Sequence, residues 1–365
     1  MRRLEWEKIK ISDEPFEAAG VADFNNNGQL DIISGGYWYE APDWSKHKIC
    51  DVKAQGEYYD CFAAYPLDVN GNGLVDFVSC AWFGQSIFWR ENPGEPGKEW
   101  TTHLIDECGN AETLQAWDVD GDGELEVVPN MPGAPISYYK LIRDDNGKGT
   151  GEFEKITIND VNAGHGLGFG DVNGDGRGDF IVADGWWEAP EEADGEWVFH
   201  EEFEIPRASI PILVEDVNGD GLAEIIGGNG HGYGIWYWQQ QVDDSGSRTW
   251  ERHDIDPFFS QYHTMVWADI DNDGQSELIT GNRYRAHCGH EEGETEVCGL
   301  YYFKWHNGRF FKRVIDHGNV PDASGTGLYM TVIDIDGDGW LDIVAPGKEG
   351  LYLFKNLGIE TVGME

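Results

Sequence analysis

Acidic and amide side chains recur at alternate positions in seven short segments of this 365-residue chain. Each segment follows the pattern Asp-x-[Asp/Asn]-x-[Asp/Asn]-Gly-x-x-[Asp/Glu], in which the glycine permits a sharp turn. Alternate residues of such a loop can direct side-chain oxygens at one centre, and Ca²⁺ takes six to eight oxygen ligands. The spacing therefore predicts several structural calcium sites.

The expected calcium ligands are the side chains at the first, third, fifth and ninth positions of each segment. An EF-hand is excluded, because it needs a bidentate glutamate at the twelfth position and no twelfth residue here is acidic. The expected ligands are Asp23, Asn25, Asn27 and Asp31; Asp68, Asn70, Asn72 and Asp76; Asp118, Asp120, Asp122 and Glu126; Asp171, Asn173, Asp175 and Asp179; Asp216, Asn218, Asp220 and Glu224; Asp269, Asp271, Asp273 and Glu277; and Asp334, Asp336, Asp338 and Asp342.

Strand-like runs of apolar and β-branched residues flank each loop, as at residues 167–170 and 179–182 around the fourth copy. A third and a fourth run follow the second one, as at residues 86–89 and 100–105. The copies begin 45 to 65 residues apart, a period that indicates a propeller or a solenoid. Each repeat therefore supplies one four-stranded unit.

Seven such repeats predict an all-β fold, a seven-bladed β-propeller that forms a single domain over residues 1–365. The seventh repeat ends after its third strand, whereas residues 4–11 form a strand-like run that belongs to no repeat. We expect this N-terminal strand to complete blade 7, which removes exposed sheet edges.

The repeated loop resembles the FG-GAP and VCBS repeats of calcium-binding β-propellers, which also form the heads of integrin α subunits. Residues 164–171 (GHGLGFGD) and 184–190 (DGWWEAP) are similar to the propeller domains of aldos-2-ulose dehydratases, and the general plan resembles propeller-type polysaccharide lyases. This resemblance implies a calcium-stabilised enzyme, a lyase or dehydratase that acts on a sugar or oligosaccharide by proton abstraction and β-elimination.

Candidate site residues gather in the turns between second and third strands and in the connections between blades. Both kinds of segment lie at the end of a propeller opposite the seven Asp-x-[Asp/Asn]-x-[Asp/Asn]-Gly segments, which are called the ion loops below. For an elimination, the base is His165 or His263, and Arg283 and Arg285 hold a carboxylate or an enolate. The expected proton donor is Tyr58, Tyr59 or Tyr284. The residues expected to bind substrate are Trp82, Trp186, Arg207, His231 and His287.

Two alternatives remain open at this face. Two or three of the histidines can instead hold a further divalent metal ion, which would act as a Lewis acid on a keto group. The repeated tryptophans can pack between blades rather than stack on sugars. The rival function is a non-catalytic calcium propeller that binds glycan or protein, as integrin heads do.

The net charge of −43 limits the classes of partner. A strongly acidic surface disfavours nucleic acid, whose phosphates need lysine and arginine, and it disfavours anionic membranes. The first residues, Met-Arg-Arg-Leu-Glu-Trp, contain no apolar run of the kind found in a signal peptide. We therefore expect neither nucleic acid nor a membrane as partner, which leaves the carbohydrate substrate. We also expect a cytoplasmic location, with secretion left open.

Chelation of calcium tests the ion loops. Because ions that bind only the folded state stabilise it, a strong chelator should lower the melting temperature. Counting acids alone, the loops that begin at Asp118, Asp269 and Asp334 should keep their ions longest, and those at Asp23 and Asp68 should lose them first. A melting temperature that does not respond to chelator would show that the loops are not metal sites.

Overall fold

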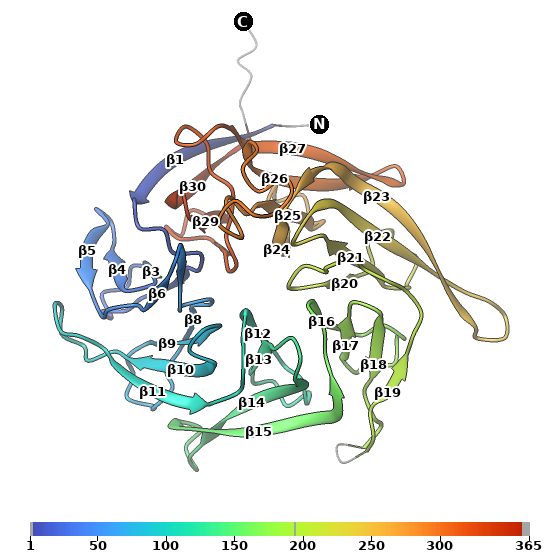
Figure 1. The fold of residues 1–365 in the computed structure, drawn as a ribbon, viewed down its shortest axis with the longest axis horizontal. Helices are drawn as coiled ribbons and strands as arrows, with labels where there is room; N and C mark the ends of the chain where they lie inside the picture. The colour runs from blue at the N-terminus through green and yellow to red at the C-terminus, as the bar shows by residue number, and fades with distance from the viewer. Residues whose placement is uncertain (1–2, 193–194, 360–365) are drawn as a thin grey trace, which may run out of the picture.

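The computed structural model describes residues 3–192 and 195–359, and it shows seven four-stranded antiparallel sheets arranged around one axis (Figure 1). The all-β, seven-bladed propeller predicted from the repeats is confirmed. No helix in these described ranges is long and apolar enough to cross a membrane.

The first strand of each blade lies nearest the axis and the fourth lies outermost (Figure 1). Blade 1 contains β2 (Gly20–Ala22), β3 (Asp31–Ser34), β4 (Tyr37–Glu40) and β5 (Ser45–Lys48). Blade 2 contains β8 (Tyr65–Leu67), β9 (Asp76–Ala81), β10 (Ser86–Glu91) and β11 (Thr101–Asp106). Between them, β6 (Ala54–Gln55) and β7 (Tyr58–Tyr59) form a small hairpin.

The next three blades follow in chain order. Blade 3 contains β12 (Thr113–Trp117), β13 (Glu126–Asn130), β14 (Pro135–Arg143) and β15 (Gly149–Asn162). Blade 4 contains β16 (Leu167–Gly170), β17 (Asp179–Val182), β18 (Gly185–Glu188) and β19 (Val198–His200). Blade 5 contains β20 (Leu213–Glu215), β21 (Glu224–Gly228), β22 (Tyr233–Val242) and β23 (Arg248–Ser260).

The last two blades bring the chain back to its start. Blade 6 contains β24 (Tyr262–Ala268), β25 (Glu277–Asn282), β26 (Cys298–His306) and β27 (Arg309–Gly318). Blade 7 contains β28 (Thr331–Ile333), β29 (Asp342–Gly347), β30 (Gly350–Ile359) and, as its outer strand, β1 (Leu4–Ser12). β1 pairs antiparallel with β30, so the expected N-terminal closure is confirmed.

The second strand of every blade is buried along its whole length. Side chains from neighbouring blades meet there, as where Ile32 of blade 1 packs with Val344 of blade 7. Burial on both faces explains why these strands are runs of apolar residues rather than alternating patterns. The core therefore lies between the blades.

Each ion loop joins the first strand of a blade to its second strand. In all seven loops, the ninth-position carboxylate is at most 1% exposed and accepts a hydrogen bond from the N–H of the loop's second residue. The first aspartate accepts further backbone N–H groups, as Asp23 does from Asn27 and Gly28. The loops therefore form at the predicted places, and in those that begin at Asp118, Asp269 and Asp334 three carboxylates lie close enough together to hold one cation.

Removing residues 1–12 tests the closure of blade 7. The deletion uncovers the edge of β30 and takes Leu4 out of the core between blades 6 and 7. We expect a lower melting temperature and self-association through the exposed edge, because unpaired strand edges pair with other chains. Calorimetry and sedimentation velocity measure both effects. A deleted protein that melts and sediments like the full chain would contradict this role for β1.

Candidate metal centre

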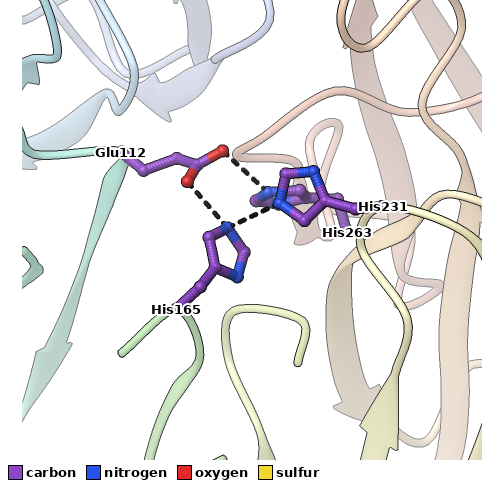
Figure 2. Close-up of side chains that lie close together, drawn as sticks. All are labelled: Glu112, His165, His231 and His263. Atoms are coloured by element: carbon purple, nitrogen blue, oxygen red, sulfur yellow. Dashed lines mark hydrogen bonds and ion pairs between the residues drawn. The ribbon is translucent and has the colours of Figure 1, made fainter. Parts of the chain in front are cut away.

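Four side chains from four consecutive blades meet near the axis, at the end of the inner strands away from the ion loops (Figure 2). Glu112 Oε2 lies 2.7 Å from His165 Nε2, and Glu112 Oε1 lies 3.1 Å from His263 Nε2. His165 Nε2 also lies 3.0 Å from His231 Nε2. The donor atoms of all four residues lie within 4.8 Å of one another.

Three of these residues share one position in the repeat. Glu112, His165 and His263 each lie six residues before the first aspartate of their ion loop, where an inner strand begins. His231 comes from a different segment, the turn between β21 and β22. The repeat register therefore delivers three donors to one place, and the blade 5 turn supplies the fourth.

Two of the histidines are oriented through their other ring nitrogen. His165 Nδ1 lies 2.7 Å from the carbonyl oxygen of Ala208, to which it donates. His231 Nδ1 lies 3.2 Å from the carboxylate of Glu291. These contacts leave Nε2 of both rings directed at the cluster, which is the arrangement that metal-binding histidines adopt.

Burial and mutual charge set the protonation of the cluster. Burial opposes ionisation of Glu112, but His165 and His263 outweigh it, so the pKa of Glu112 lies well below its ordinary value. The pKa of His165 is raised, because the Glu112 carboxylate outweighs the effect of burial. Burial lowers the pKa of His231 and that of His263 to about 3.

The donor set fits a divalent transition metal. Two imidazole nitrogens 3.0 Å apart share either one proton or one cation, and a carboxylate oxygen faces both His165 and His263. Three nitrogens and a carboxylate suit zinc, manganese or iron, whereas calcium prefers oxygen alone. The side chains of His165 and His231 are 18% and 13% exposed, so solvent reaches the centre from the face of the propeller opposite the ion loops.

A buried ion-pair network lies beside the centre. Arg283 is 1% exposed and donates from Nε and Nη2 to both oxygens of Glu17, at 2.8 and 3.3 Å. Its Nη1 lies 3.5 Å from Glu112 Oε1 but makes no hydrogen bond within the described part of the chain. Lys348 Nζ lies 3.4 Å from Glu17. Arg283 thus balances two buried carboxylates.

A second histidine–carboxylate pair borders the centre on its open side. Glu291 Oε2 lies 2.8 Å from His287 Nδ1, and the rings of His287 and His231 are 4.7 Å apart. Tyr58 lies 6.1 Å from His287, ring to ring, and Lys348 Nζ lies 4.4 Å from the Tyr58 ring centroid. His231, His287 and Glu291 together form a second group that can hold a metal ion.

The structure brings only part of the predicted site together. The histidines at 165, 231, 263 and 287 converge, and Tyr58 and Arg283 lie beside them. Arg285 pairs with Glu57 at a more exposed position, and Arg207, 65% exposed, lies 3.8 Å from Glu291. Trp82 and Tyr284 are half-buried, and both lie in turns between a second and a third strand.

Two predictions from sequence need correction. Trp186 is fully buried, stacks on His200 and donates to Glu202, so in this fold it packs inside blade 4 and offers no face to a sugar. Arg283 is not free to hold a substrate carboxylate, because Glu17 already takes two of its nitrogens. In both cases burial between blades removes the side chain from solvent.

The sequence interpretation missed the carboxylates of the site. They are Glu17, Glu112 and Glu291, and the cation Lys348 was missed as well. Glu17 and Glu112 stand at the same repeat position as His165 and His263, six residues before a loop aspartate. Aligning the seven repeats on their loops and reading that one column is the signal that finds them.

Arg283 and Arg285 are two residues apart in the sequence and each pairs with a glutamate, so they allow a matched test. Replacing Arg283 with Met leaves Glu17 and Glu112 buried without their guanidinium, which should cost about 3–5 kcal/mol of unfolding free energy. Replacing Arg285 with Met breaks a largely exposed pair and should cost about 0–1 kcal/mol. Chemical denaturation of the two variants measures the difference. Equal losses would contradict the structural role of Arg283.

Comparisons with known proteins agree with the repeat and the fold. Residues 68–128 and 216–280 match the model of the FG-GAP-like repeat. No curated protein matches the sequence. Crystal structures of BBS1N in complex with ARL6DN, soaked with mercury and with lead, are 10% and 11% identical, with TM-scores of 0.54 and 0.52 and 100% coverage of both chains. The V. cholerae biofilm matrix protein Bap1 is 11% identical with a TM-score of 0.39, over 99% of this chain and 84% of that one. At 10% and 11% identity, the likeness to the two BBS1N structures shows the fold alone. The chain is a seven-bladed β-propeller that contains FG-GAP-like repeats.

Proposed function

We propose that the protein is a metal-dependent enzyme acting on carbohydrate, a lyase or dehydratase that works by proton abstraction and β-elimination. The observation that supports it best is the convergence of Glu112, His165, His231 and His263 within 4.8 Å. A divalent transition metal bound there would act as a Lewis acid on a substrate carbonyl or carboxylate oxygen. The calcium ions of the loops would stabilise the propeller at its other end.

A groove along blade 4 comes near the centre at Gly164 and extends to the outer strand β19, and we propose it as a binding place for part of a sugar chain, with none of Glu112, His165, His231 and His263 in its lining. Its volume is about 730 Å³, within the range of small-ligand sites, and its wall includes Gly164, the residue before His165, and Arg207. A sugar ring has apolar C–H faces and polar edges, so aromatic walls with a few charged groups suit it. The aromatic side chains of this wall are Trp187, Phe199 and Phe203.

The proton transfers would use groups next to the ligands. Elimination takes a proton from the carbon beside a carbonyl or carboxylate, breaks the C–O bond at the next carbon and protonates the departing oxygen, leaving a C=C bond. His287 suits the first transfer, because it borders the centre and its imidazole, whose Nδ1 lies 2.8 Å from Glu291 Oε2 without hydrogen-bond geometry, can accept a proton. Tyr58 beside it suits the second. His165 and His263, the two bases considered from sequence, are proposed here as ligands.

The alternative function is a non-catalytic calcium propeller that binds glycan or protein. One observation favours it: each nearby cation already has a carboxylate partner in the chain. Arg283 and Lys348 pair with Glu17, and Arg285 pairs with Glu57. An anionic substrate would have to compete with these carboxylates.

Metal content and turnover test the proposal together. Protein purified without chelator should contain one zinc, manganese or iron ion per chain by elemental analysis. Glu291→Gln should weaken that ion's binding about 10–100-fold, because it removes an orienting carboxylate, and Glu112→Gln should weaken it more. The loaded protein should release unsaturated products, seen by ultraviolet absorbance, from uronic-acid glycans or keto-sugars.

His287→Ala separates chemistry from metal binding. This variant should keep the ion and lose turnover, whereas Glu57→Gln, which alters the Arg285 pair, should keep both. Absence of a transition metal in the wild-type protein would overturn the metal centre. A bound ion without turnover on either substrate class would support the non-catalytic alternative.

A further inference from the structure

The third strand of each blade places one side chain opposite the ion loop. In every blade the tenth residue of the loop pattern pairs with a third-strand residue, as Ile32 does with Tyr39. The next residue along the third strand therefore faces the buried ninth-position acid. In order from blade 1 to blade 7, these facing residues are Glu40, Glu91, Lys140, Glu188, Gln239, Lys304 and Lys355.

The facing residue varies together with the third residue of the loop. Where the loop has asparagine at that position, in blades 1, 2, 4 and 5, the facing residue is glutamate or glutamine. Where the loop has aspartate there, in blades 3, 6 and 7, the facing residue is lysine. The acid-rich loops are thus the ones that receive an ammonium group.

The side chains make contact accordingly. Lys304 Nζ lies 2.5 Å from Asp271, 2.7 Å from Asp273 and 2.9 Å from Glu277, the third, fifth and ninth residues of its loop. In blade 3, Lys140 pairs with Asp120 and lies 2.6 Å from Asp122. In blade 7, Lys355 Nζ lies 2.5 Å from Asp336.

The glutamates of the asparagine loops are held in the corresponding place. Asn25 Nδ2 donates to Glu40 at 2.9 Å, and Asn70 Nδ2 donates to Glu91 at 3.0 Å. The other oxygen of Glu40 lies 3.0 Å from His47 Nε2, on the fourth strand. The carboxylate therefore stays at the loop rather than turning into solvent.

The pairing gives the seven loops nearly the same net charge. Counting only the four ligand positions and the facing residue, four carboxylates and one ammonium give −3 in blades 3, 6 and 7, and two loop carboxylates and one glutamate also give −3 in blades 1 and 2. The further acid of the blade 3 loop, Glu124, pairs with Arg143. Three carboxylates and a glutamine give −3 in blade 5. Blade 4 carries −4, and there Arg177 pairs with Asp175.

We propose that the facing residue sets the charge of each calcium site, so that the seven loops bind calcium with similar affinity despite holding two to four acids. Lys140, Lys304 and Lys355 weaken acid-rich sites, and Glu40, Glu91 and Glu188 strengthen acid-poor ones. This removes the ranking expected from the acids of the loop alone, because the ligands within the loop are only part of the charge that an ion meets.

Blade 6 can be tested by converting it into the ligand set of blade 5. Calcium is titrated into the chelator-treated full chain in competition with a chromophoric chelator. Lys304→Gln should make one site about tenfold tighter or more, since it removes a positive charge a few ångströms from the ion. Adding Asp271→Asn gives the Asp, Asn, Asp, Glu and Gln of blade 5 and should return that site to the wild-type affinity.

Blade 1 provides the opposite test, which does not depend on the folding of the blade 6 variants. Glu40→Gln should weaken one site about tenfold. Lys8→Gln, which breaks the ion pair with Asp316 away from any loop, should leave calcium binding unchanged. Release of ions from the wild-type protein in the order of loop acid count, or variants at Lys304 and Glu40 that bind like the wild type, would overturn the proposal.

Discussion

One hydrogen bond recurs in every blade and fixes the geometry of the molecule. It joins the buried ninth-position carboxylate to the N–H of the second loop residue. In the four loops with a ninth-position aspartate, such as Asp31, its other oxygen accepts a second N–H from the residue just after the third strand or, in blade 7, from Asn356 within that strand. A buried carboxylate is costly unless it is hydrogen-bonded, so these contacts hold the start of the second strand against the end of the first. The register of the whole blade follows.

A fixed register has a consequence at the opposite face. Six residues of extended chain span about 20 Å. The residue six positions before the first aspartate of a loop therefore lies at the beginning of the inner strand, at the opposite face from the loop. That position holds polar residues in blades 1, 3, 4 and 6 and buried apolar ones in blades 2, 5 and 7. The fold therefore separates two chemistries, oxygen-rich sites at one face and a nitrogen-rich cluster at the other. Blades 5 and 7 contribute to that cluster through turns instead, with His231 and Lys348.

The sequence predicted what is local and repeated. Loop ligands, strand order, blade number and the closing strand all follow from patterns within about fifty residues or from counting repeats. The contacts that define the centre are not local: Glu112 and His263 are 151 residues apart, and Arg283 and Glu17 are 266 apart. Glu112 is also one acid among 68, so its type alone gives no signal. The burial of Trp186 and Arg283 depends on how neighbouring blades meet, which no single repeat contains.

The scarcity of cations sharpens the argument for a metal at the centre. With 25 lysines and arginines against 68 acids, the chain places an ammonium or guanidinium beside clustered carboxylates, as with Lys304 and Arg283. Glu112 faces the imidazoles of His165 and His263 as well as Arg283 Nη1, which lies 3.5 Å from its Oε1. A single proton on His165 Nε2 can be donated to Glu112 or to His231, but not fully to both. A shared divalent cation would satisfy the facing nitrogens and the carboxylate at once, and the proposed metal centre rests on this arrangement.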